Sequence, residues 1–328
     1  MKLLRFLFLI LLVSGATTRC RATPTPSPTP RPTPSPTTAP AALFPPPQPG
    51  DGSDLLDQLL ETGVIRVGLR VWPHADFSPP AFRGYSNAET GGALNGMEVD
   101  IARWIATGLG LELEFVEAYP PVLSTGDWRG QWDIAFGSLA PFDQPPDTVH
   151  TPLLFSTPYA YMPMSFLTPE SDPPLPIANL TGQPIGALEY SAWYDLLFTP
   201  TLTVEQQPVL TVPTEWQAVP ISNMSHAIRQ LGQPDPADAP PPLAAIFGPT
   251  PVLQAAISED WPVQLAVEPE IVGYQPQAIA AVPRDELGAE RLITALDRIL
   301  HQLQRQGTLA EIHLKWYGQN LSQPPASE

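Results

Sequence analysis

The chain has 328 residues, with 16 basic and 33 acidic side chains and a net charge of −17. A charge of this sign and size argues against nucleic acids and anionic membrane surfaces as partners. The length leaves room for two domains, and the single cysteine excludes an intramolecular disulfide.

The N-terminus has the pattern of an export signal. Lys2 and Arg5 precede an apolar run over residues 6–13, and small residues follow at 14–16. This order is typical of a secretory signal. The run is shorter than the roughly 20 apolar residues that a membrane-spanning helix needs. We therefore expect an exported protein at the cell surface or in the periplasm.

Cys20 leaves two alternatives for the processing of this signal. A lone cysteine between an apolar signal and a polar tether resembles a bacterial lipoprotein, which would be anchored by a lipid on Cys20. Arg19 departs from that pattern, because a small residue is expected there, and residues 14–16 offer an ordinary cleavage site. We assign residues 1–22 to the signal segment and residues 23–50, rich in Pro, Thr and Ser, to an extended tether.

The first predicted α/β unit follows the tether. Residues 64–69 are a β-rich run, and apolar residues then recur at helical spacing from Met97 until Gly110. Residues 111–116 alternate apolar and acidic side chains, and residues 133–136 are a short apolar run. The pattern predicts a strand, a helix and two further strands.

A second unit repeats this rhythm. We expect strands over residues 184–188 and 243–247, with a helix between them over residues 224–231. Strands that alternate with helices indicate an α/β sheet.

Two helices are expected at the C-terminal end. The first has one apolar face and should end at Gly307, which suits a left-handed cap. The second should begin with a capping box made by Thr308 and Glu311. The apolar face of the first helix consists of Leu292, Leu296, Ile299, Leu300 and Leu303.

Four short segments, spread from residue 65 to residue 318, follow the pattern of one bacterial family. They are residues 65–68 with 95–102 (NGMEVDIA), 132–139 with 155–159 (FSTPY), 177–186 (IANLTGQPIG), and 306–312 with 315–318 (KWYG). They are similar to G-F-D-V-D-L-A, F-S-x-P-Y, L-x-G-K-x-V-G and G-T-x-x-x-I-x-x-K-W-x-G of the family 3 extracellular solute-binding proteins. These are the periplasmic receptors for polar amino acids that serve ABC importers.

The resemblance implies an α/β periplasmic-binding-protein fold of type II with two lobes. The chain would cross between the lobes twice, near Met164 and near Gln275. Residues 51–164 with 275–328 would form the first lobe, and residues 165–274 the second. A small molecule would close the lobes, and an ABC permease in the membrane would receive it. We expect a monomer without a cofactor.

The expected binding positions depart from the amino-acid receptors of this family. The arginine that grips a ligand carboxylate falls near Pro145, with no arginine close by. The first-lobe acid that holds the ligand ammonium falls near Arg70, and the second-lobe acid falls near Gly248. Arg70 could hold an anion, or it could be a surface charge paired with an acid. We therefore predict that the ligand is not a standard α-amino acid.

The other candidate contacts are small or aromatic side chains. Gly137, Ser138 and Ala140 fall at the small hydroxyl positions of the family, and Ser191 keeps one hydroxyl in the second lobe. Stacking aromatics would suit a flatter, more apolar or hydroxyl-rich ligand. The aromatic candidates are Trp72, Phe82, Tyr119, Tyr190 and Trp193, of which we expect Tyr119 and Trp193 in loops.

No motif in the sequence indicates catalysis. It has no G-x-S-x-G and no H-E-x-x-H, and its five histidines lack metal-ligand spacing. We therefore do not expect an enzyme. Two alternatives are an enzyme similar to the cyclohexadienyl dehydratases, with Glu189 as general acid, and a degenerate module that senses or scaffolds without binding a ligand.

Overall fold

The structure is a computed structural model that describes the chain from residue 44, with several gaps. The described residues are 44–71, 82–83, 93–143, 153–171, 173–211, 215–232, 243–257 and 265–325. The predicted signal, Cys20 and most of the predicted tether lie outside them. None of the helices in these ranges is long and apolar enough to cross a membrane.

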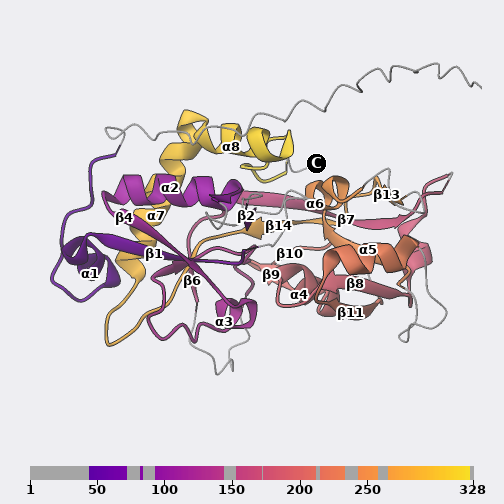
Figure 1. The fold of residues 1–328 in the computed structure, drawn as a ribbon, viewed down its shortest axis with the longest axis horizontal. Helices are drawn as coiled ribbons and strands as arrows, with labels where there is room; N and C mark the ends of the chain where they lie inside the picture. Colours follow the sequence, from indigo (N-terminus) through magenta and orange to yellow (C-terminus); the bar gives the residue numbers. More distant parts are fainter. Residues whose placement is uncertain are drawn as a thin grey trace, which may run out of the picture. The chain divides into compact units, whose positions relative to one another are not determined.

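The described residues form two main β-sheets flanked by helices (Figure 1). The first sheet has the strand order β4-β1-β5-β15-β6, and these strands span Glu112–Glu117, Val64–Leu69, Ile134–Ala135, Ala280–Ala281 and Leu154–Phe155. The second has the order β11-β8-β12-β7-β13, and these span Gln217–Ile221, Pro184–Leu188, Ala245–Pro249, Ala160–Pro169 and Leu265–Val267. The α/β class predicted from the sequence is confirmed.

Two small ribbons accompany the sheets. They pair β2 (Phe82–Arg83) with β3 (Leu94–Asn95) and β9 (Thr203–Val204) with β10 (Gln207–Pro208).

The helices gather beside one or the other sheet (Figure 1). Those beside the first are α1 (Leu55–Thr62), α2 (Met97–Leu109), α3 (Pro120–Thr125), α7 (Glu290–Gln306) and α8 (Thr308–Tyr317). Those beside the second are α4 (Ala192–Phe198), α5 (Met224–Gly232) and α6 (Thr250–Ala255), and a 3₁₀ helix spans Ile177–Leu180.

Most predicted elements are present, with shifts at their ends. The strand over 64–69 is β1, and the helix that begins at Met97 is α2, which ends at Gly110 with a φ of 72°. The strand expected over 243–247 begins two residues later, as β12, and the Ala244 amide already bonds to the carbonyl of Pro184 on β8. Phe44, inside the predicted tether, packs edge-on against Trp104 of α2 at 6.5 Å between ring centroids.

Two neighbouring strands carry the chain between the sheets. The chain passes from β6 in the first sheet to β7 in the second, and it returns from β14 (Gly273–Gln277) to β15. β7 and β14 pair antiparallel, with Met162 opposite Gln275 and Met164 opposite Gly273. The expected crossing points near Met164 and Gln275 thus lie side by side in one ladder.

The predicted capping box at the start of the last helix is wrong. Gly307 has a φ of 81° and ends α7, as expected, but it also directly precedes α8. Thr308 is consequently the first residue of α8 and not its cap, and no side chain caps this helix. A single glycine between two helices leaves no position for a Thr308 cap.

His313 on α8 should make the protein sensitive to acid. Its side chain is fully buried, and neither ring nitrogen has a hydrogen-bond partner among the described residues. Burial lowers the pKa of His313 to about 4 from 6.5, so the unfolded chain binds a proton first as the pH falls. The native state should lose about 3 kcal/mol of stability through this group between pH 7 and pH 4.

Chemical denaturation of His313→Leu and wild type between pH 7 and pH 4 tests this effect. On acidification, the free energy of unfolding of His313→Leu should rise by about 3 kcal/mol relative to that of wild type. The control variant His301→Leu, at an exposed position of α7, should show no such rise. Parallel pH profiles for wild type and His313→Leu would contradict the role of this histidine.

Candidate functional site

Arg70 makes contact across the boundary between the two sheets. It follows β1 directly, and its Nη1 donates hydrogen bonds to the carbonyl oxygens of Glu189 at 3.2 Å and Tyr190 at 2.9 Å, just after β8. Burial lowers the pKa of Arg70 to about 10, against the opposing effect of the charges on Glu189 and Glu98. The guanidinium is therefore charged at neutral pH. Both acceptors are neutral backbone carbonyls on the second-sheet side of the boundary.

The turn after β5 places Gly137 and Ser138 beside Arg70. Gly137 has a φ of 137°, and a Cβ added there would lie 3.1 Å from Leu123 Cδ1 and 3.3 Å from Arg70 Cβ. The turn therefore requires glycine at this point. Ser138 is buried with a φ of 58°, and its carbonyl oxygen accepts a 3.0 Å hydrogen bond from Gln275 Nε2 on β14.

The side chain of Glu98 holds the same turn by hydrogen bonds from α2. This fully buried side chain on α2 accepts hydrogen bonds at Oε1 from the amides of Gly137 at 3.2 Å and Ser138 at 2.9 Å, and from the Tyr159 hydroxyl at 2.8 Å. Its second oxygen, Oε2, is buried and has no partner in the described part of the chain. Burial raises the pKa of Glu98, although these hydrogen bonds and the charge of Arg70 oppose the shift.

Glu98 was not among the residues that the sequence singled out. It lies in the family-like segment NGMEVDIA, so its position was visible, but its hydrogen bonds to residues about 40 positions away were not.

The second-sheet side of the site is the start of α4. Ser191 is the N-cap of this helix: its Oγ accepts from the Tyr194 amide at 3.3 Å and donates to the Leu188 carbonyl at 2.6 Å. Tyr190, with a φ of 55°, is half exposed. Ser191 is thus occupied as a helix cap, and Tyr190 presents its ring to solvent.

Trp193 lies inside the protein and not in a loop, which corrects our expectation. Because Ser191 caps α4, Trp193 falls in the first turn of the helix, where it is 1% exposed. Gly248 on β12 lies next to it, and a Cβ added there would be 3.7 Å from Trp193 Cε3 and 3.5 Å from Leu253 Cδ2. An added Cβ would thus make ordinary van der Waals contacts with both side chains.

The remaining candidates are scattered or not described. Tyr119 precedes α3 and is exposed, whereas Ala140 is buried. Phe82 lies in β2, where it pairs with Asn95, and its side chain is not described. Trp72 and Pro145 lie outside the described residues.

Asp143, two residues before Pro145, is a second contact across the boundary that sequence reasoning missed. Its carboxylate accepts from Thr203 Oγ1 at 2.6 Å, the Glu205 amide at 3.1 Å and the Gln206 amide at 2.8 Å. Its own amide donates to the Thr203 carbonyl at 2.9 Å. These hydrogen bonds lower the pKa of Asp143, the Thr203 hydroxyl most of all. An acid therefore lies two positions in the sequence before Pro145, where the resemblance implies an arginine.

No group of three or more His, Cys, Asp and Glu side chains that could hold a metal ion occurs in the ranges that the structure describes. The site offers two charged contacts across the boundary, backbone groups in turns, and exposed tyrosines. Such a set can make hydrogen bonds and stacking contacts with a solute.

Comparison with known families decides the assignment. The sequence model of one family, the bacterial extracellular solute-binding proteins, family 3, matches residues 69–319 of this chain. The chain belongs to this family. A comparison with curated proteins gave no match. As a family 3 member it is a solute-binding protein of the ABC-transporter type, and the resemblance of the four sequence segments is confirmed.

Solved structures share the fold of this family 3 protein. One is AbpA of Streptococcus pneumoniae, an amino acid ABC transporter substrate-binding protein bound to L-arginine, with 18% identity, a TM-score of 0.58, and coverage of 81% of this chain and 100% of that one. Another is the P235GK mutant of ArgBP from T. maritima, with 18% identity, a TM-score of 0.57, and coverage of 80% and 99%.

A third solved structure is the ancestral amino acid-binding protein AncCDT-1, a precursor of cyclohexadienyl dehydratase, with 18% identity, a TM-score of 0.56, and coverage of 80% and 100%. At these identities the likeness shows the two-lobed type II fold, with two chain crossings between the lobes.

Replacing Glu98 with Gln should remove the cost of ionising this buried carboxyl. Because burial raises its pKa above the usual 4.5, the stability that Glu98 contributes is present below pH 4.5 and is lost as the pH rises through the native value. Glu98→Gln keeps an Oε1 acceptor for the three donors. Its free energy of unfolding should therefore rise relative to wild type from pH 4 to pH 8 in urea denaturation.

Glu311→Gln, at an exposed position on α8, is the matched control for Glu98→Gln. A difference between Glu98→Gln and wild type that stays constant with pH would show that burial does not penalise this carboxylate.

Removing the Asp143 carboxylate should loosen the β9–β10 ribbon. Asp143→Ala leaves the amides of Glu205 and Gln206 without their acceptor, so their hydrogen exchange should accelerate by about tenfold. NMR or mass-spectrometric exchange at constant pH measures this change. Asp127→Ala removes an exposed acid paired with Arg129 and should leave both rates unchanged; equal rates in all three proteins would exclude the proposed support.

Proposed function

We propose that this family 3 protein captures a small molecule outside the cytoplasm by closing two lobes and delivers it to an ABC permease. Residues 51–164 with 275–328 form the first lobe of this proposal, and residues 165–274 the second. The proposal is supported by the paired crossing strands, which allow a hinge, and by Arg70 and Asp143, which both make contacts between the proposed lobes.

The ligand in this proposal is not a standard α-amino acid. The observation that carries it is Arg70, a partly buried cation just after β1, where the resemblance implies an acid for the ligand ammonium. An ammonium group placed there would meet a like charge in a partly desolvated site, which is unfavourable.

The other charged positions support the same conclusion. Gly248 carries no charge at the second implied acid, and its neighbours Trp193 and Leu253 pack close to it. At the implied arginine the sequence has Pro145 and, two residues earlier, the acid Asp143, so no arginine stands there for a ligand carboxylate. Both ends of a zwitterion would therefore be poorly matched.

An uncharged or hydroxyl-rich solute suits the site better. Tyr119 and Tyr190 expose large parts of their rings, and tyrosine combines an apolar face with a hydroxyl.

In our proposal the protein is exported and acts outside the cytoplasm. The signal-like N-terminus and the Pro-rich tether support a protein held at a distance from the membrane surface. The export signal could be processed in two ways, by attachment of a lipid to Cys20 or by cleavage after residue 16. The mass of the mature protein distinguishes these two alternatives.

Calorimetric titration with the 20 standard amino acids tests the ligand class. We expect no Kd below about 10 μM for any of them, because the charge of Arg70 opposes the ammonium group and no arginine stands near Pro145 for the carboxylate. AbpA with L-arginine, titrated in parallel, provides the positive control. Tight binding of one amino acid would overturn the ligand proposal and leave the transport role intact.

Thermal-shift screening of uncharged and hydroxyl-rich metabolites then tests capture itself. A ligand that closes the lobes must raise the melting temperature, since it binds the native state only. A screen without any shift would favour a scaffold without ligand over a receptor.

A further inference from the structure

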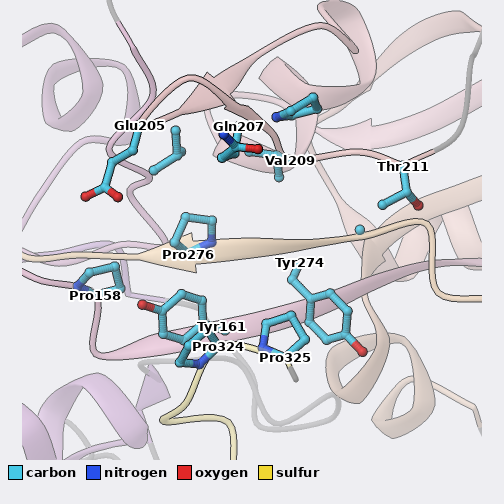
Figure 2. Close-up of a pocket in the computed structure, with 13 residues that line it drawn as sticks. Pro158, Tyr161, Glu205, Gln207, Val209, Thr211, Tyr274, Pro276, Pro324 and Pro325 are labelled. Carbon is cyan, nitrogen blue, oxygen red and sulfur yellow. The ribbon is translucent and has the colours of Figure 1, made fainter. Parts of the chain in front are cut away.

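A cavity of about 500 Å³ lies away from Arg70 and Glu98, on the outer side of the crossing strands. Figure 2 shows its walls: Tyr161 on β7, Tyr274 and Pro276 on β14, the β9–β10 ribbon with Glu205 opposite them, and Pro324 and Pro325 near the C-terminal end. Its volume lies within the range of small-molecule sites, roughly 300–1,000 Å³.

Strand β14 separates this cavity from the candidate solute site. Side chains alternate along a strand, so Tyr274 and Pro276 face one side while Gln275 and Gln277 face the other. Gln275 and Gln277 are fully buried, and Gln275 donates to the Ser138 carbonyl in the candidate site. The cavity is therefore a second place where a molecule could bind, on the opposite face of the same strand.

The cavity walls are apolar, but they carry one charge. Glu205 is the charged residue among those that line the cavity, and it takes part in none of the ion pairs between the residues that the structure describes. None of the described residues that line the cavity is basic. Burial raises the pKa of Tyr161, and the negative charge of Glu205 adds to the shift, so the phenol lies within the field of that carboxylate.

Glu205 is also fixed in place by its backbone. It has a φ of 51° in the turn between β9 and β10, and its amide donates to Asp143. The carboxylate therefore projects from a turn with a defined geometry, at the same end of the cavity as the Tyr161 hydroxyl (Figure 2).

We propose that this cavity binds a small organic cation with an apolar body, such as a quaternary ammonium compound. Tyrosine faces attract a cation through their negative π-electron density, and the proline walls accept its methyl groups. Glu205 supplies the opposite charge, and the net charge of −17 attracts cations to the whole protein. This site is distinct from the solute site of the proposed function.

Choline and its uncharged analogue 3,3-dimethylbutan-1-ol test the proposal on the full-length protein. The two have nearly the same shape, so a difference in binding reports the charge. We expect choline to bind saturably in calorimetric or NMR titrations, at least about fivefold more tightly than the analogue. Glu205→Gln and Tyr274→Ala should each weaken choline binding by about fivefold.

Two matched variants control for indirect effects. Glu311→Gln removes an exposed acid on α8, and Phe198→Ala removes an exposed aromatic ring on α4. Both should bind choline as wild type does. Both Glu205 and Tyr274 are exposed, so these substitutions should leave the fold intact, which circular dichroism can check.

Three results would overturn the proposal. The first is the absence of saturable choline binding, and the second is equal binding of choline and its analogue. The third is choline binding that neither Glu205→Gln nor Tyr274→Ala weakens, which would place the cation elsewhere, including the solute site.

Discussion

The antiparallel pairing of β7 with β14 is the constraint on which the rest of the structure depends. Both passages of the chain between the two sheets run through this ladder, from Ala160 opposite Gln277 to Met164 opposite Gly273. Because the passages are hydrogen-bonded to each other, the sheets cannot move independently along two separate linkers. Any change in the relative orientation of the two sheets has to bend or twist the short β7–β14 ladder, which is the requirement for a hinge.

Two carboxylates hold two turns of the chain. Glu98 accepts the amides of Gly137 and Ser138, and Asp143 accepts those of Glu205 and Gln206. In each case two successive amides of a turn with positive φ angles point at one side chain. Hydrogen bonds to a carboxylate are stronger than those between neutral groups, so they offset part of the backbone strain.

Local patterns in the sequence predicted the elements well, and contacts between distant residues explain what they missed. Strand β1 was predicted from the β-rich run at 64–69, and helix α2 from the apolar spacing between Met97 and Gly110. Both predictions succeeded because each signal lies within a few neighbouring residues. Trp193 was misplaced, since one hydroxyl, that of Ser191, decides where α4 starts.

The candidate site was less predictable for the same reason. Arg70 could be named from the segment order, but its bonds to Glu189 and Tyr190 join residues about 120 positions apart. The role of Asp143 depends on a turn some 60 positions away. No pattern along the chain encodes such pairs, because they arise only when both sheets have formed.

The turn between β9 and β10 lacks the residues that usually make such a turn. Two-residue loops with positive φ at both positions favour Asn-Gly, yet Glu205 and Gln206 occupy this one, with φ of 51° and 64°. Neither is a residue that readily adopts this conformation, so the turn depends on a carboxylate from the opposite side of the boundary. Separating the two sides would break the hydrogen bonds to Asp143 but would also let the turn relax its unfavourable backbone, so the separation costs less than the lost hydrogen bonds alone. The conformational preference of one small loop thereby lowers the free energy that keeps the two halves of the protein together.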